Sequence, residues 1–160
     1  MILKRRRPHA FERDGDRTAI RLGDDERSML ANLAGQFRTL VADDADPDLR
    51  RLYPTAYPDD PKRDADYSGL VHEDLVRTRV AAADTVVATA SAVSLDSDQL
   101  AAWMQILNGL RLLLGTRLDI SEEDEFDPEA EDAPTRALLS WLGFLLEEAV
   151  VAAAADLDDA

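Results

Sequence analysis

Four segments of this 160-residue chain carry apolar side chains at helical spacing, and they constrain the fold more than any other feature. Apolar residues recur at intervals of three and four over residues 24–42, 68–94, 97–114 and 135–155. Such periodicity is typical of amphipathic helices that bury one face. The sequence therefore predicts a mainly α fold, a bundle of about four principal helices in a single domain over residues 1–160.

The first 23 residues are instead expected to form a short N-terminal β-hairpin. Residues 18–22 alternate with period two around Ile20 and Leu22, and Asp14-Gly15 before them is a strong turn signal. Ile2 and Leu3 are expected to open the first strand. Because an isolated hairpin is marginal in water, this one must pack on the helices or pair with another copy.

The helix ends are marked by local signals. Asp96 and Gln99 form a capping-box pattern at the start of the third helix, and Gly115 is expected to end it. The last helix, over residues 135–155, is apolar around most of its circumference. It is therefore expected to be either the central helix of the bundle or part of a subunit interface.

Residues 43–67 lie between the helix at 24–42 and the helical core at 68–155, and they are rich in proline. Pro54, Pro58 and Pro61 are expected to exclude regular helix until about Ser68. A long structureless loop is uncommon within a compact domain. This segment is therefore predicted to be an ordered arm.

Tyr53 and Tyr57 supply the arm with apolar anchors that simple linkers lack. We expect both rings to dock on the helices, where they could close over Arg111 or Arg117. High mobility of this segment would contradict that expectation.

An unusual polar set lies on the third helix, in "WMQILNGLRLLLGTRLDI". Asn108, Arg111 and Arg117 are its members, and Arg111 falls on or beside the apolar stripe. A buried guanidinium needs a carboxylate, because an unpaired buried charge is strongly destabilising. Either an acid of the preceding helix pairs with Arg111, or Arg111 recognises an acidic group of a partner; the candidate acids are Glu73, Asp74 and Asp84.

The net charge of −15 is unevenly distributed. Residues 1–23 carry seven basic and three acidic side chains, so the rest of the chain is strongly acidic. An acidic body repels phosphate backbones, and direct nucleic-acid binding is expected to be weak or absent. The remaining candidates for a basic contact with phosphate or with an acidic protein are Lys4, Arg5, Arg6 and Arg7.

Motifs for catalysis and cofactor binding are not found. The chain has no cysteine and two histidines, and it has neither a glycine-rich phosphate loop nor a Gly-x-Ser-x-Gly motif. We therefore predict no catalytic, cofactor-binding or metal site and no enzymatic activity. Trp103 and Trp141 fall on helical stripes and are expected to be core anchors.

No secretory signal or membrane span is expected from the apolar pattern. The longest apolar segment, residues 137–155, is interrupted by Ser140, Glu147 and Glu148. The first residues are charged and no apolar signal region follows them. A cytoplasmic location is therefore the expectation.

Three stretches of the chain together resemble one family. They are "RRLYPTAYPDDP" (50–61), "LAAWMQILNGLRLLLGTRLDISEED" (100–124) and "LLSWLGFLLEEAV" (138–150). They are similar to the signatures of the actinobacterial family known as domain of unknown function 2017 (DUF2017). This chain departs from the pattern at Asn108-Gly109, where the family often has Asn-Asp.

The resemblance implies a small cytoplasmic regulatory protein, because the best described member is a mycobacterial oxidative-stress regulator of transcription. In that member, a disulfide switch is thought to allow association with a stress sigma factor. A chain without cysteine cannot form that switch. We therefore expect a transcription-linked interaction protein and a homodimer, formed through the hairpin or an apolar helix face. The alternative is an accessory factor for Clp-type proteolysis, and an enzyme with a polar pocket at Arg111 and Arg117 is a third, weaker hypothesis.

Overall fold

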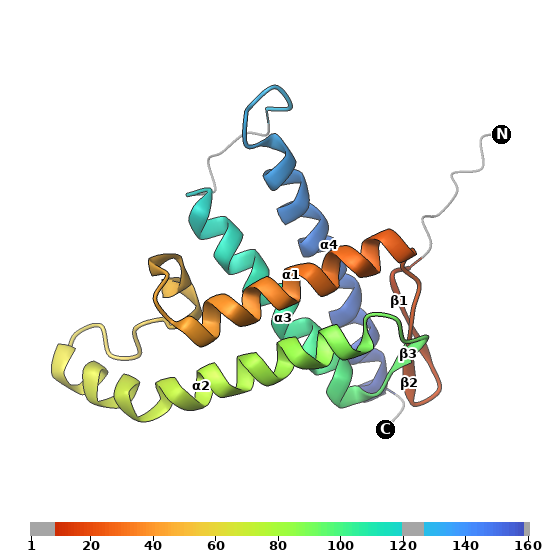
Figure 1. Cartoon of the computed structure of the whole chain (residues 1–160). Helices are drawn as coiled ribbons and strands as arrows, with labels where there is room; N and C mark the ends of the chain where they lie inside the picture. The colour runs from red at the N-terminus through yellow and green to blue at the C-terminus, as the bar shows by residue number, and fades with distance from the viewer. Residues whose placement is uncertain (1–8, 120–126, 159–160) are drawn as a thin grey trace.

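The fold is mainly α, as predicted, with four long helices and a small antiparallel sheet (Figure 1). The computed structural model describes residues 9–119 and 127–158. The elements in chain order are β1 (Phe11–Asp14), β2 (Arg17–Ile20), α1 (Asp24–Asp43), the 3-10 helix η1 (Pro47–Leu52), α2 (Pro61–Thr89), β3 (Ser94–Leu95), α3 (Ser97–Arg117) and α4 (Ala133–Asp158).

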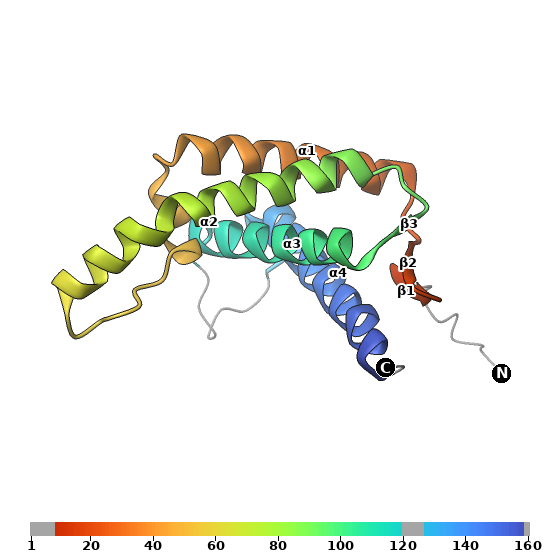
Figure 2. The same cartoon turned by 90° about the horizontal axis from the view of Figure 1, so that it is seen from below.

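Helix α3 is the centre of the bundle. The antiparallel pair α1 and α2 lies on one side of it, and α4 crosses its other side (Figure 2). Helix α3 also contacts η1 and the strands β2 and β3. Its side chains are consequently buried on several faces; they include Leu100, Trp103, Ile106, Leu107, Leu110 and Leu113.

Of the two alternatives expected for the last helix, the central position is therefore wrong, and a subunit interface stays a prediction. Helix α4 packs on α3 and β1, and it leaves Phe144, Val150 and Val151 exposed. Residues Ala133–Ala155 are long and apolar enough to cross a membrane by length and composition alone, and 22% of the most apolar window is buried. Core helices of soluble proteins meet the same criterion, so this is weak evidence for a membrane span.

The hairpin forms, but its first strand lies later in the sequence than predicted. Strand β1 pairs with β2 from Phe11↔Ile20 to Asp14↔Arg17, and Gly15 in the turn has a φ of 63°. A positive φ favours glycine, which explains the turn signal. The predicted opening residues, Ile2 and Leu3, lie outside the described residues.

A third strand, β3, extends the sheet in the order β1-β2-β3. It pairs with β2 through Thr18↔Leu95 and Ala19↔Ser94. Two residues are too few to produce a recognisable alternation, so the sequence pattern gave no sign of it.

The sheet closes one end of the helical core. Phe11 meets the ring of Trp103 edge-on, with 5.8 Å between centroids. Trp103 is fully buried, as predicted for a core anchor, and its indole Nε1 donates a hydrogen bond of 2.8 Å to Thr89 Oγ1. Trp141 is partly buried and packs against the core.

Helix α2 begins at Pro61, seven residues before the predicted start at Ser68. Proline is tolerated in the first turn because its missing N–H has no partner there and its φ is already helical. The Asp60 side chain completes the N-terminus by accepting from the Arg63 backbone N–H at 3.1 Å. The arm is correspondingly shorter than predicted, since η1 and α2 take both of its ends.

Two other helix ends also differ from the predictions. Helix α2 ends at Thr89 rather than near Ser94, which leaves room for the turn into β3. Helix α3 continues through Gly115 to Arg117. A Cβ on Gly115 would lie 3.4 Å from Arg51 Nη1, so this glycine admits the arginine of η1 and does not stop the helix. The predicted capping box is confirmed, with Asp96 and Gln99 bonding each other's backbone N–H groups.

Arg27 of α1 joins the sheet to the helices from a partly buried position. Its guanidinium donates to the backbone carbonyls of Leu22 and Ile20, each at 2.9 Å. It also donates to the carbonyls of Ala90 (2.9 Å) and Ala92 (2.7 Å) in the connection after α2. One side chain thus satisfies acceptors from two segments that are far apart in the sequence.

Candidate functional site

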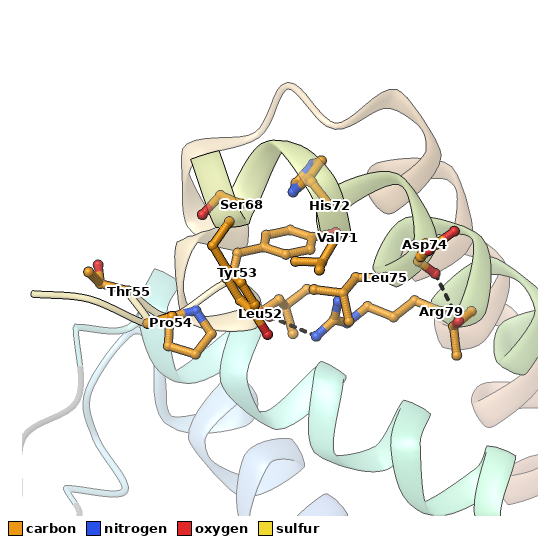
Figure 3. A pocket seen from close by; sticks show the side chains of 13 residues that line it. Leu52, Tyr53, Pro54, Thr55, Ser68, Val71, His72, Asp74, Leu75 and Arg79 are labelled. Atoms are coloured by element: carbon orange, nitrogen blue, oxygen red, sulfur yellow. Dashed lines mark hydrogen bonds between the residues drawn. The ribbon is translucent and has the colours of Figure 1, made fainter. Parts of the chain in front are cut away.

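A cavity of about 580 Å³ lies between the arm and the first half of α2 (Figure 3). The arm contributes one wall and α2 contributes the other. The lining residues include Leu52, Tyr53, Pro54, Val71, His72, Asp74, Leu75 and Arg79. Mostly apolar cavities of this size with a few polar groups are typical of binding sites.

The arm is anchored at its beginning by η1 and Arg117. Asp46 caps η1 by accepting from the Asp48 N–H at 2.9 Å, and Leu49 and Leu52 are buried. Arg117 Nη2 lies 2.9 Å from Asp46 Oδ2, and Arg117 Nε lies 3.3 Å from Asp48 Oδ2. The Asp48 N–H and then the Arg117 guanidinium lower the pKa of Asp46. Arg117 therefore ties α3 to the arm.

The far end of the arm is anchored on α2. The Asp64 carboxylate accepts from the backbone N–H groups of Ala56 (2.8 Å) and Tyr57 (3.1 Å). The Tyr57 ring packs edge-on against the Tyr67 ring with 5.8 Å between centroids, and Arg63 Cζ lies 4.3 Å from the Tyr57 centroid. The two anchors make the wall of the cavity an ordered segment.

Tyr53 docks on α2, beside residues that the sequence did not single out as site residues. Its ring centroid lies 4.4 Å from that of His72 and 4.7 Å from Arg79 Cζ. Arg79 Nη2 donates to the Leu52 carbonyl at 2.7 Å, and His72 Nε2 lies 2.5 Å from Asp44 Oδ2. Both tyrosines dock on a helix, as predicted, but the cation near the Tyr53 ring is Arg79 and the cation near the Tyr57 ring is Arg63. The expectation that the rings close over Arg111 or Arg117 is wrong.

Two buried polar atoms beside the cavity make no hydrogen bond. They are the Tyr53 hydroxyl and Arg79 Nη1. Burial raises the pKa of Tyr53 above its ordinary value; the charge of Arg79 opposes this shift, and the Asp44 carboxylate adds to it. Buried polar groups without partners are rare in folded proteins, so this pair is a candidate binding feature.

Arg111 lies away from this cavity, on the face of α3 that meets α4. A Cβ on Gly143 would lie 3.5 Å from Arg111 Nε, so the glycine lets the guanidinium lie directly on α4. Arg111 Nε is buried without a hydrogen-bond partner. Asn108 is exposed on α3. The structure therefore does not bring Asn108 and Arg111 together with Tyr53 and Tyr57.

The predicted pairing of Arg111 with an acid of the preceding helix is also wrong. Asp84 pairs with Arg38 at 2.6 Å, Asp74 pairs with Arg77 at 2.8 Å, and Glu73 is exposed. The physical reason is rotation, because the face of α3 that carries Arg111 turns toward α4 and not toward α2.

The remaining predicted contact residues, Lys4, Arg5, Arg6 and Arg7, lie outside the described residues. Within residues 9–119 and 127–158, no group of three or more His, Asp or Glu side chains could hold a metal ion.

Sequence reasoning missed His72 and Arg79 as site residues. Their spacing of seven places both on one face of a helix, which is the only signal that could have joined them. Which loop covers that face depends on the tertiary fold.

Comparison with known proteins gives one match. No curated protein and no solved structure is significantly similar to the chain. A family model described as "Domain of unknown function (DUF2017)" matches residues 8–153, which is nearly the whole chain. The resemblance drawn from the three stretches is thereby confirmed, and the chain belongs to the DUF2017 family.

Proposed function

We propose that this chain is a non-enzymatic regulatory protein of the cytoplasm that acts by binding a protein partner along the first half of α2. The observation that carries the proposal is the cavity, one wall of which is an apolar strip formed by Tyr67, Val71 and Leu75. The strip is open to solvent, with Tyr67 45% and Leu75 38% exposed. This part of α2 extends beyond α1 and α3 (Figures 1 and 2). Exposed apolar groups beside a cavity are typical of interaction sites.

The leading partner class is the transcription machinery, a sigma factor or another RNA polymerase component. The family resemblance supports it, although the thiol switch of the mycobacterial regulator has no counterpart in a chain without cysteine. A component of a Clp-type protease is the alternative. The strip on α2 suits either partner, so the identity of the captured protein decides between them.

A charge placed on the strip is expected to abolish partner capture. Leu75→Glu changes a side chain of this strip that is 38% exposed, so it should disturb binding with little effect on the fold. The measurement is a crosslinking pull-down from native lysate, with mass spectrometry of the captured proteins. Polymerase components captured by the wild type and lost in the variant would support the leading proposal, and Clp components would support the alternative.

Val93→Glu is the matched control for that experiment. Val93 is 81% exposed but lies in the connection after α2, where its carbonyl accepts from the Ile20 N–H of β2 at 2.9 Å. It should retain the partner at the wild-type level. Equal capture by all three proteins would contradict a binding role for the strip.

We also propose a homodimer formed through the free face of α4. Phe144 and Val151 are seven residues apart, so they share a face, and Val151 is 65% exposed. Light scattering is expected to give a dimer mass for the wild type and a monomer mass for the Phe144→Ser, Val151→Asp double variant. The double variant should keep helical circular dichroism, because both positions are exposed, and a monomeric wild type would exclude the dimer.

A further inference from the structure

We infer that the cavity captures the C-terminal residue of the partner polypeptide, with an apolar side chain in the cavity and its free carboxylate on Tyr53 and Arg79. This inference rests on the proposed function, because it takes the occupant to be a protein. It adds the chemistry by which that partner is recognised.

The unsatisfied donors indicate a carboxylate. Arg79 Nη1 can only donate, and the Tyr53 hydroxyl has a proton to donate; neither has a well-aligned acceptor among the described residues, although the Arg79 guanidinium lies close enough to the hydroxyl to oppose the rise that burial causes in the pKa of Tyr53. The second terminal nitrogen of Arg79 is already taken by the Leu52 carbonyl at 2.7 Å. A carboxylate has two oxygens and can accept from both free donors at once, whereas a carboxamide has one oxygen and no charge.

The charges around the cavity favour an anion in spite of the acidic chain. Asp74 lines the cavity but pairs with Arg77 at 2.8 Å. The Asp44 carboxylate, whose charge acts on the Tyr53 hydroxyl, lies 2.5 Å from His72 Nε2. Arg79 is left as the lining charge that no described carboxylate offsets. The remaining walls, Leu52, Pro54, Val71 and Leu75, suit an apolar side chain.

The surface beyond the cavity indicates a polypeptide end rather than a small free acid. Tyr67, which is 45% exposed, continues the apolar strip from the cavity along the projecting part of α2. A small acid would leave this strip in water, but the residues that precede a C-terminus would cover it. Both donor atoms are buried, so binding of the carboxylate requires the Tyr53 ring to shift.

The test is an NMR titration of the full chain with matched acid and amide probes. The probes are the tetrapeptide acetyl-Ala-Val-Ser-Leu with a free carboxylate, the same peptide as its carboxamide, and the small acid 4-methylpentanoate. The free-acid peptide should give saturable shifts of the Arg79 Nε–Hε and Tyr53 ring signals. The carboxamide should bind at least about ten-fold more weakly, because it loses the charge-assisted bonds.

Variants separate recognition from folding. Tyr53→Phe removes a hydroxyl that has no partner, so the melting temperature should not fall, yet binding of the free-acid peptide should weaken about ten-fold. Arg79→Gln should abolish the preference for acid over amide. Arg38→Gln, which removes the same charge on α1, should leave that preference unchanged.

Three outcomes would overturn the inference. They are no saturable shift with any probe, equal affinity for the acid and amide peptides, and 4-methylpentanoate binding as tightly as the free-acid peptide. The last outcome would make the site one for free small acids. Failure of the pull-down with acid-selective peptide binding intact would instead count against the proposed cellular function and leave the site chemistry standing.

Discussion

Replacing Arg27 with methionine is expected to lower the free energy of unfolding by about 3 kcal/mol. The guanidinium donates to the carbonyls of Ile20, Leu22, Ala90 and Ala92, all between 2.7 and 2.9 Å. Methionine keeps much of the side-chain volume but leaves these acceptors without donors. The cost of an unpaired buried acceptor, about 1–3 kcal/mol each, exceeds the small net gain of an ordinary hydrogen bond.

Urea unfolding followed by circular dichroism measures this change, and Arg21→Met is its control. Arg21 also lies next to the hairpin, but it is half exposed and pairs with an exposed Glu12 at 2.6 Å. Its replacement should change the free energy of unfolding by less than about 0.5 kcal/mol. Arg27→Lys should recover only part of the loss, since one ammonium group has three donors and cannot reach four carbonyls as the planar guanidinium does. A loss below about 1 kcal/mol for Arg27→Met would show that water replaces the guanidinium at these carbonyls.

Arg27 also illustrates what sequence patterns leave out. Periodicity located the four long helices, and the capping box at Asp96 fixed the start of α3, because both signals depend on residues close in the chain. The carbonyl acceptors of Arg27 become neighbours only when the turn after α2 folds back onto the sheet. No local sequence pattern predicts such a tertiary contact.

Proline at the start of α2 shows a different limit. The proline content of the arm predicts no helix at Pro61, yet Pro61 opens α2, because proline disrupts helix interiors and suits helix starts. The preceding Asp60 is an N-cap residue, and Asp-Pro is a start signal that the sequence did contain. This error was one of interpretation rather than of missing information.

The sequence predicts the residues that the arm contributes to the candidate site, but not their partners on α2. Tyr53 and Tyr57 were recognisable as anchors because aromatic residues are unusual in a proline-rich linker. Their partners, Arg79 and Arg63, depend on how α2 is rotated about its axis and on where the arm crosses it. The rotation of α3 about its axis likewise determines that Arg111 faces α4, although the sequence correctly places it beside the apolar stripe.

Replacing Gly109 with alanine is expected to destabilise the protein by up to about 2 kcal/mol, although alanine is the better helix former. A Cβ at this position would lie 2.7 Å from Phe37 Cζ and 3.0 Å from Cε2, closer than real Cβ atoms come to their neighbours. Phe37 is 1% exposed, so its ring has no free space to move into. Overpacking of this kind costs about 1–3 kcal/mol, and the gain of about 1 kcal/mol from helix propensity offsets only part of that cost when the Phe37 ring cannot move.

A double-mutant cycle with Phe37→Leu identifies the overlap as the cause. The shorter leucine removes the ring atoms that meet the new methyl group, so the two changes together should destabilise less than the sum of their separate effects. Gly35→Ala is the control on the neighbouring helix, because no atom lies within 4 Å of its Cβ position. That change should stabilise the protein by about 0.5–1 kcal/mol. Additive effects of Gly109→Ala and Phe37→Leu would show that the contact between α1 and α3 relaxes freely. The close approach of Phe37 to Gly109 would then contribute nothing to the packing of α1 on α3.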